Sequence, residues 1–399
     1  MPGAFDIRVS AVTGETFSLE EVFEAYHCCR RHKRNKASAL AFEVDLENQL
    51  IELWRQLNSG SWKPGPAAVF IVEKPVKREI FAAGFSDRIV HHVLINRLNP
   101  YFEKTFIYDS YSCRIGKGTH FGIERIKRFV RQCSANYSRD AWVLKLDIRG
   151  FFMHISRPLL MELIDHFLAR VYPFPDLLAI LALCRSLVLN DPLVGCQRRS
   201  QMELWDDLPR DKSLFGVAPG LGLPIGNLTS QVFANFYLDG LDHFCKHELG
   251  LRYYGRYVDD LVIVHENREY LAGMVPRIRD WLARERLLEL HQGKTRLQHH
   301  SRGVPFLGSF ILPGRVYPGA RLRANFAASV DRHNAVVLAA QPDRAAREAF
   351  RSSMNSYLGI LGHSDSWRFR VGLLDERLSP WWKRRFVLPT AAGRVVSRG

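Results

Sequence analysis

The sequence predicts an α+β protein in which an antiparallel sheet is backed by helices. Strand-like runs at 142–148 and 253–265 end or turn at acidic residues. Helical patterns cover 157–170, 228–247 and 268–286. At 399 residues the chain is also too long for one compact core, so two or three lobes are expected.

Composition excludes several classes of protein. Apolar residues make up 47% of the chain and charged residues 24%, which is typical of a globular protein and not of a disordered one. No apolar run approaches the roughly 20 residues that a bilayer span needs, and the first residues do not resemble a secretory signal. The 7 cysteines are scattered without a Cys-x-x-Cys pair, which argues against a disulfide framework or a zinc site. We therefore expect a cytoplasmic protein with no membrane partner.

The charge balance points to a partner that carries phosphates. The net charge is +15, and basic residues cluster at 30–36, 125–128 and 381–385. Each run alone is equally consistent with a solvated face. Together with an aromatic content of 12%, they favour nucleic acid, because aromatic rings stack on bases while cations bind the backbone.

The N-terminal third predicts helices and one strand pair. Residues 18–58 read as two helices; the first begins with the capping box Ser18-x-x-Glu21 and the second stops at Gly60. Alternating residues then predict strands at 68–72 and 78–81, joined by a basic turn.

Two more helices are expected, capped by Ser86 and Thr119, each with an apolar stripe. The loop at 111–120 is rich in glycine and cations and runs into the second of these helices. Such a loop is one way to bind phosphate, and an ordinary connecting turn is the alternative.

The central and C-terminal parts are predicted to contain a hairpin, an inserted loop and a helical lobe. Strands at 253–257 and 261–265 predict a hairpin whose turn is Asp259-Asp260. A polar stretch at about 188–220 predicts an inserted loop. After Arg323 the pattern is helical to about 361 and then irregular, as expected of a separate small lobe.

Three acidic residues are the strongest candidates for chemistry. Asp147 ends an apolar strand, and Asp259 and Asp260 place two more carboxylates in one tight turn. Carboxylates that repel one another in an apolar setting need a compensating cation, and hard oxygen ligands suit Mg²⁺. Two such ions about 4 Å apart can catalyse an in-line phosphoryl transfer. The alternative is a surface hairpin and an unrelated aspartate that caps a helix.

Several motifs in order carry a resemblance to a known family. They are Leu144-Lys145-Leu146-Asp147-Ile148-Arg149-Gly150-Phe151-Phe152, Gly222-Leu223-Pro224-Ile225-Gly226-Asn227-Leu228-Thr229-Ser230-Gln231 and Arg256-Tyr257-Val258-Asp259-Asp260. They resemble motifs A, B and C of reverse transcriptases. Gly293-Lys294-Thr295 and Gly303–Gly308 resemble motif D and the primer grip, and Lys77–Ile80 with Asp87–His92 resemble fingers motifs.

The resemblance implies a right-hand polymerase that copies RNA into DNA. Residues 1–140 would form the fingers, 141–325 the palm with the inserted loop, and 326–399 a helical thumb and tail. The implied reaction joins dNTPs to a DNA primer on an RNA template, with two Mg²⁺ ions that Mn²⁺ can replace.

The resemblance also assigns roles to single residues. Asp147, Asp259, Asp260 and the Ile148 carbonyl would hold the metal ions, and Lys294 would protonate pyrophosphate. Residues expected at the nucleotide are Lys74, Arg78, Phe151, Phe152, Ile225, Gly226 and Gln231, with Phe152 as the steric gate against a 2′-hydroxyl. Phe306, Leu307 and Gly308 would form the primer grip. The alternatives are solvated cations for Lys74, Arg78 and Lys294, and core residues for the aromatics.

Motif B narrows the resemblance. Ile225, with Ser230 and Gln231, resembles enzymes of diversity-generating retroelements and defence-associated reverse transcriptases, and the long stretch before motif B favours the defence branch. Either branch implies a cognate structured non-coding RNA, and an accessory protein or a second reverse transcriptase as a further partner.

An aliphatic side chain at Ile225 lacks an amide beside the nucleotide sugar, so relaxed base selectivity is expected. An Ile225→Gln variant should misincorporate less often, measured by sequencing products; an unchanged misincorporation spectrum would refute this hypothesis.

Other classes of function stay open at this point. One is an RNA-binding scaffold with a polymerase shape and no turnover. Another is a template-independent polymerase that uses its own hydroxyl group as primer.

Overall fold

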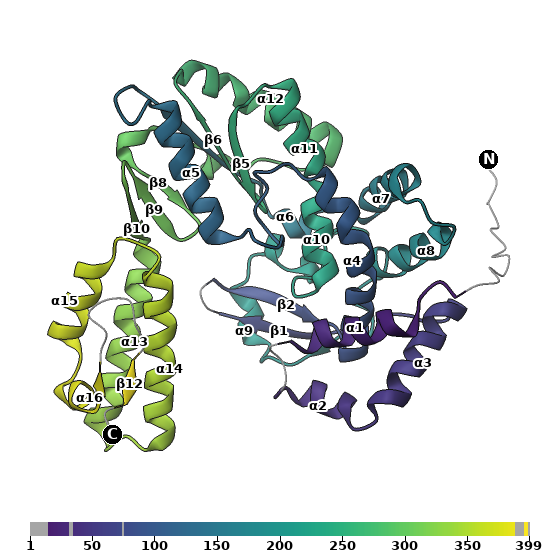
Figure 1. The fold of residues 1–399 in the computed structure, drawn as a ribbon, viewed down its shortest axis with the longest axis horizontal. Helices are drawn as coiled ribbons and strands as arrows, with labels where there is room; N and C mark the ends of the chain where they lie inside the picture. The colour runs from purple at the N-terminus through teal and green to yellow at the C-terminus, as the bar shows by residue number, and fades with distance from the viewer. Residues whose placement is uncertain (1–14, 32–34, 74–75, 388–394, 398–399) are drawn as a thin grey trace. The chain divides into compact units, whose positions relative to one another are not determined.

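The computed structural model describes residues 15–31, 35–73, 76–387 and 395–397 (Figure 1). The chain divides into two compact units. The first comprises Met1–Arg114, Asp147–Gly250 and Pro276–Gln292, and the second comprises Ile115–Leu146, Leu251–Val275 and Gly293–Gly399. Each unit is therefore built from segments that are distant in the sequence.

The first unit is mainly helical. Its main helices are α1 (Leu19–Arg30), α2 (Ala37–Glu43), α3 (Leu46–Ser59), α4 (Phe85–Thr105), α6 (Phe151–His154), α7 (Arg157–Val171), α8 (Leu177–Val188), α10 (Leu228–Tyr237) and α11 (Asp239–His243), which continues into the π-helical turn η3 (Phe244–Glu248). The capping box at Ser18 and the left-handed stop at Gly60 are confirmed. Three helices, and not two, occupy 18–59, because α2 forms a separate short element.

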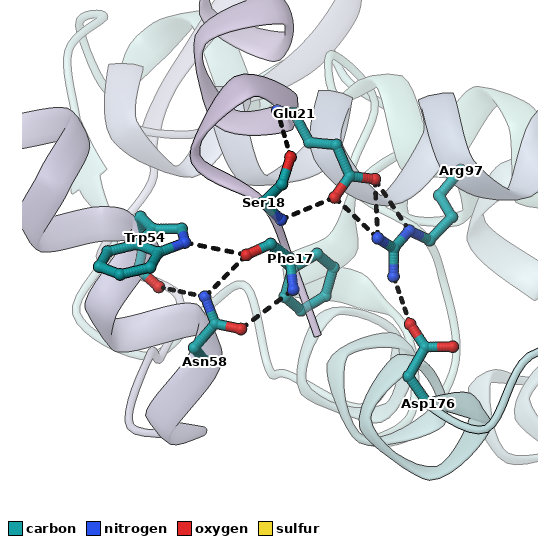
Figure 2. A network of polar contacts seen from close by, with 7 residues as sticks. All are labelled: Phe17, Ser18, Glu21, Trp54, Asn58, Arg97 and Asp176. Carbon is teal, nitrogen blue, oxygen red and sulfur yellow. Dashed lines mark hydrogen bonds and ion pairs between the residues drawn. The ribbon is translucent and has the colours of Figure 1, made fainter. Parts of the chain in front are cut away.

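A polar network fixes α1 against its neighbours, as Figure 2 shows. Arg97 of α4 points between two carboxylates, with its Nη2 2.7 Å from Oε2 of Glu21 and its Nη1 paired with Asp176. The Phe17 carbonyl accepts hydrogen bonds from Trp54 Nε1 and Asn58 Nδ2, both at 2.9 Å. These bonds hold the start of α1 on α3 and α4, and Arg97 lies partly buried, where a guanidinium needs such partners.

The predicted strand pair is confirmed as β1 (Ala68–Val72) and β2 (Arg78–Ala82), which are antiparallel. A third strand, β4 (Gln197–Arg198), pairs with β1 in parallel. The helix that follows, α4, begins at Phe85 with Gly84 as its N-cap, so Ser86 lies inside the helix and does not cap it. The expected apolar stripe of α4 is buried.

The stretch expected to be an inserted loop contains short elements of regular structure. Besides β4 they are α9 (Glu203–Asp206), η1 (Arg210–Lys212) and η2 (Leu214–Gly216). We call residues 188–220 the insertion. Its elements are too short for a periodic pattern, and contacts with β1 and β2 stabilise them, which explains why the sequence predicted a loop.

The second unit contains the sheet that carries the candidate chemistry. Its strands are β3 (Trp142–Asp147), β5 (Tyr253–Tyr257), β6 (Asp260–His265) and β7 (Arg296–His299), in the order β5-β6-β3-β7. Helix α5 (Thr119–Cys133) packs on β5 and β6, with the rings of Phe129 and Tyr253 5.7 Å apart. Gly118, and not Thr119, is the N-cap of α5. Helix α12 (Arg268–Arg286) has the predicted bounds and crosses the division between the units.

A second sheet and a helical lobe complete this unit. The sheet has the order β10-β9-β8, with β8 (Val304–Phe306), β9 (Ser309–Leu312) and β10 (Arg315–Pro318). The lobe comprises α13 (Ala320–Ala339), α14 (Arg344–Leu361), α15 (Trp367–Arg377), α16 (Pro380–Arg385), β11 (Phe386–Val387) and β12 (Val396–Ser397). Within the segment after 361 that was expected to be irregular, residues 367–377 and 380–385 are thus helical. Trp382, fully buried and stacked on Phe350 at 4.1 Å, organises its core.

Among the helices in the described ranges, none combines the length and the hydropathy needed to cross a membrane.

Candidate active site

The central sheet brings two of the predicted acidic segments to neighbouring strands. β3 ends at Asp147, β6 begins at Asp260, and the two strands are hydrogen bonded to each other. Lys145 of β3 lies beside β6, with its Nζ 2.9 Å from Oδ1 of Asp260. Asp147 itself belongs to the first unit, and Asp259 and Asp260 belong to the second.

The hairpin turn differs from the expectation by one residue. Tyr257 pairs with Asp260, so the turn consists of Val258 and Asp259, and Asp260 is the first residue of β6. Val258 has a φ of +55°, which a β-branched side chain rarely adopts. Its carbonyl oxygen accepts a hydrogen bond of 3.1 Å from Nη1 of Arg256, a fully buried guanidinium. Strain of this kind persists only where the surroundings hold it, and it concentrates at functional sites.

The segment that follows β3 is fixed within the first unit. The Asp147 carbonyl accepts a hydrogen bond of 2.8 Å from the His291 amide, and the Arg149 amide donates to the Glu289 carbonyl at 2.9 Å. Between them, Ile148 forms an isolated bridge with Leu290, and its side chain is 1% exposed. The backbone around the predicted metal-binding carbonyl is therefore held in place by the strand-like segment at 289–291.

The donor set of the predicted metal site is made of hard oxygen atoms, the ligands that Mg²⁺ prefers. In the part of the chain that the structure describes, no group of three His, Cys, Asp or Glu side chains is arranged to hold a metal ion. The structure shows instead that Lys145 pairs with Asp260. The chemistry of the donors fits a magnesium ion, and the site itself stays a prediction.

Most of the predicted nucleotide contacts lie in the first unit. Phe151 is buried, whereas Phe152 is half-buried, and their rings meet edge to face with centroids 5.5 Å apart. The Ile225 carbonyl accepts a hydrogen bond of 2.8 Å from the Phe81 amide of β2. Gly226 has a φ of +126°, and a Cβ there would lie 2.8 Å from the Phe81 carbonyl oxygen. Glycine at 226 thus lets motif B approach β2 closely.

The other predicted nucleotide contacts are charged or polar. Arg78 is exposed at the start of β2, and Gln231 is exposed on α10, where its Oε1 is 3.4 Å from Sγ of Cys113. Lys74 lies outside the described residues.

The second unit contains Lys294 and the predicted primer-grip residues 306–308. Lys294 is exposed in the short 3₁₀ turn η4 (Gln292–Lys294). Phe306 is buried at the end of β8, and Leu307 and Gly308 form the turn to β9 with φ values of +48° and +78°. The Gly319 amide donates to the Gly308 carbonyl at 2.8 Å, which fixes this turn against the chain that leads into α13.

Two site residues were missed by the reasoning from sequence. Lys145, the partner of Asp260, carries a visible signal, because it is the one cation in a strand that is apolar apart from Asp147. Glu79 is fully buried in β2 and accepts three hydrogen bonds from the insertion. Its only signal is an acidic residue at an inward-facing strand position, which by itself does not identify the donors.

A buried histidine lies directly behind motif B. Nδ1 of His91 on α4 is 2.9 Å from Oγ1 of Thr229 on α10. Burial, together with a smaller effect of repulsion by His92 and Arg88, lowers the pKa of His91 to about 4. The imidazole ring of His91 is therefore neutral in the folded protein at neutral pH.

This histidine predicts that acid destabilises the protein. An unfolded histidine has a pKa of about 6.5, so between pH 6.5 and 4 the unfolded chain binds a proton that the folded chain does not. Stability should thus fall by about 2 kcal/mol from pH 7 to pH 5 through this group alone. Urea unfolding at both pH values, compared with a His91→Gln variant, measures it. Equal pH dependence in both proteins would contradict the prediction.

The sequence of the chain is similar to those of known proteins. A family model described as "Reverse transcriptase (RNA-dependent DNA polymerase)" matches residues 76–311, which is more than half of the chain. The nuclear intron maturase 1, mitochondrial, of Arabidopsis thaliana is 22% identical over 304 residues, 59% of this chain and 42% of that protein. Protein YkfC of Escherichia coli (strain K12) is 24% identical over 298 residues, 65% of this chain and 70% of that protein. The chain thus spans less than half the length of the maturase.

A solved structure supports the fold. Apo telomerase from Candida tropicalis matches with a TM-score of 0.50 and 12% sequence identity, covering 84% of this chain and 65% of that chain. At this identity the likeness shows the fold alone. It confirms the predicted α+β fold of a right-hand polymerase.

Proposed function

Because the chain belongs to the reverse transcriptase (RNA-dependent DNA polymerase) family, we propose that it extends a DNA primer with dNTPs on an RNA template. The primer 3′-oxygen forms a bond to the α-phosphorus of the dNTP, and the bond from that phosphorus to the pyrophosphate oxygen breaks. The single observation that carries the proposal is the match over residues 76–311, which includes motifs A, B and C.

We propose that Asp147, Asp259 and Asp260, with the Ile148 carbonyl, form the metal-binding centre. The pairing of β3 with β6 supports this proposal. So does the contact between Lys145 and Asp260, because Lys145 and Asp147 are two positions apart and leave the strand on the same face. Two Mg²⁺ ions bound there, or Mn²⁺ in their place, would activate the attacking hydroxyl group and stabilise the leaving oxygen.

The nucleotide is proposed to lie against residues of the first unit. Arg78 and Lys74 would bind the triphosphate, a role that suits the bidentate geometry of a guanidinium. The half-buried ring of Phe152 would exclude a ribose 2′-hydroxyl, with Phe151 supporting it from the core. Ile225, Gly226 and Gln231 would contact the sugar and base, and the bond from the Phe81 amide to Ile225 supports a fixed position for that segment.

Two further roles are proposed in the second unit. The exposed Lys294 would donate a proton to pyrophosphate, because the leaving oxygen gains negative charge as the bond breaks. Phe306, Leu307 and Gly308 would hold the primer end, and the hydrogen bond from the Gly319 amide to the Gly308 carbonyl, which holds this turn in place, supports this. In this scheme, 1–140 act as fingers, 141–325 as palm and 326–399 as thumb.

The biological role is proposed by resemblance. The motif B sequence and the insertion support the branch of diversity-generating and defence-associated reverse transcriptases, and we place the chain in antiviral defence, with mutagenic retrohoming as the alternative. The proposed partners are a cognate non-coding RNA, a DNA primer and product, and an accessory protein or second reverse transcriptase. The proposed location is the cytoplasm.

Primer extension by the purified protein tests the proposed function. The assay supplies dNTPs, Mg²⁺ or Mn²⁺, and an annealed DNA primer on RNA, and the product is sequenced. A product complementary to the RNA supports the proposal. A product unrelated to the RNA, or attached to protein after phenol extraction, would replace it with template-independent or self-primed synthesis. RNA binding without any product would replace it with a scaffold.

A further inference from the structure

Glu79, the second residue of β2, is a fully buried carboxylate. Its Oε1 accepts hydrogen bonds from Trp205 Nε1 at 2.7 Å and from Ser213 Oγ at 2.8 Å. Its Oε2 accepts a hydrogen bond of 2.8 Å from the Leu214 amide. All three donors belong to the insertion. A carboxylate this deep is costly unless its oxygens accept hydrogen bonds, so these bonds hold the insertion on β2.

The residues of β2 differ in their exposure to solvent. Glu79 and Phe81 are buried, whereas Arg78 is exposed. Neighbouring residues of a strand point to opposite faces, so Glu79 faces the insertion while Arg78 leaves by the other face. The Phe81 amide donates to the Ile225 carbonyl. β2 therefore connects the insertion to two of the residues proposed to contact the nucleotide.

The insertion also packs on the segments that carry motifs A and B. A Cβ on Gly222 would clash with Cδ2 of Leu214, and a Cβ on Gly150 would lie 3.1 Å from the Asp211 carbonyl oxygen. One apolar cluster contains Val69, Phe81, Met153 and Leu214, with Phe152 and Ile225 packed against it. A displaced insertion would thus disturb the supports of Arg78, Phe152 and Ile225 together.

We propose that Glu79 is a positioning residue. It holds the insertion in place, and the insertion in turn fixes the residues that would bind the incoming dNTP. The buried carboxylate locks the insertion on β2 and thereby sets the positions of Arg78 and Ile225. It acts through these residues and does not touch the nucleotide. This inference rests on the proposed polymerase function.

The role of Glu79 can be separated from a merely structural one. General destabilisation removes active protein and lowers the apparent kcat, whereas misplaced nucleotide contacts raise KM for the dNTP. In Glu79→Gln, an amide NH₂ group must face one of three donors, so at least one hydrogen bond is replaced by repulsion. Trp205→Phe removes one donor and keeps most of the ring. Glu21→Gln is the matched control, because Glu21 accepts charged hydrogen bonds from Arg97 elsewhere in the same unit.

Steady-state primer extension measures these effects. Glu79→Gln should raise KM for dNTP about tenfold with kcat changed less than about twofold, and Trp205→Phe should raise it about threefold. Trp205→Phe should raise KM less in the Glu79→Gln background than in the wild type, because the two residues share one interaction. Glu21→Gln should leave KM unchanged. A wild-type KM in folded Glu79→Gln and in Trp205→Phe would overturn the inference while the polymerase function stood.

Hydrogen exchange supplies a readout that does not depend on activity. In Glu79→Gln, amides of β2 and of residues 203–216 should exchange faster together, while α1 and α3 keep their protection. Unchanged hydrogen exchange in both segments would overturn the proposal that Glu79 holds the insertion on β2, even if KM rose. Should the wild type extend no primer at all, the proposed function fails and the positioning role falls with it. Should Glu79→Gln fail to fold, Trp205→Phe and Ser213→Ala, which each remove one donor, decide the question.

Discussion

Replacing Asp259 with asparagine is expected to lower the rate of primer extension at least about 1,000-fold while RNA binding is kept. Asparagine has nearly the same shape as aspartate, so the turn of Val258 and Asp259 can persist. The substitution removes the negative charge that the proposed metal centre needs. Single-turnover extension measures the rate, and filter binding measures RNA affinity.

Asp375→Asn is the matched control for this prediction, because Asp375 is an exposed aspartate on α15. It should extend primers at the wild-type rate. The double variant Asp259→Ala/Asp260→Ala should be as inactive as Asp259→Asn, because the residues act as one unit. A wild-type rate in Asp259→Asn would contradict the assignment of Asp259 to the catalytic centre.

Replacing Phe152 with valine is expected to raise the use of ribonucleotides relative to deoxynucleotides about 100-fold. The ring of Phe152 is half-buried and lies edge to face on Phe151, so it is held in place while one side stays accessible. Valine removes the bulk that would clash with a 2′-hydroxyl. The ratio of kcat/KM for dNTP and rNTP measures the effect.

Phe174→Val is the control for Phe152→Val. Phe174 is 55% exposed and also lies edge to face on a neighbouring ring, that of Tyr172. Its loss should leave the ratio of dNTP to rNTP use unchanged. An active Phe152→Val enzyme with the wild-type ratio would identify Phe152 as a packing residue and not as a gate.

Local signals explain the parts of the fold that the sequence predicted well. The capping box at Ser18, the stop at Gly60 and the bounds of α12 depend on residues a few positions apart. The strands β1 and β2 show the alternation of one buried face. Because such patterns need no knowledge of distant residues, they can be read from one sequence.

The parts that were missed depend on contacts between distant segments. The turn of the hairpin moved to Val258-Asp259 because the pairing of Tyr257 with Asp260 sets the register, and no local signal favours valine at a positive φ. The sequence predicts a loop for the insertion because β4 and α9 are too short to show a periodic pattern. Trp382 of α16 is buried in a core that it shares with α13, α14 and α15, and no local pattern reveals this burial.

The same difference between local signals and contacts of distant segments applies to the candidate site. Asp147, Asp259 and Asp260 were found from their places at strand ends and from the order of the motifs. The burial of Glu79 was not foreseen, because its donors lie more than 120 residues away in the insertion. Sequence reasoning thus found groups proposed to act on the substrate and missed a group that supports them.

The central claim is that Asp147 and Asp259 converge on shared divalent ions. Fe²⁺ bound in place of Mg²⁺, with ascorbate and peroxide, produces hydroxyl radicals that cut the chain beside the metal, and mass spectrometry locates the cuts. We predict cuts at both 147–148 and 258–260, suppressed by excess Mg²⁺ and absent in Asp259→Asn. Cuts at only one of these segments, or at neither, in protein that extends primers would contradict the claim.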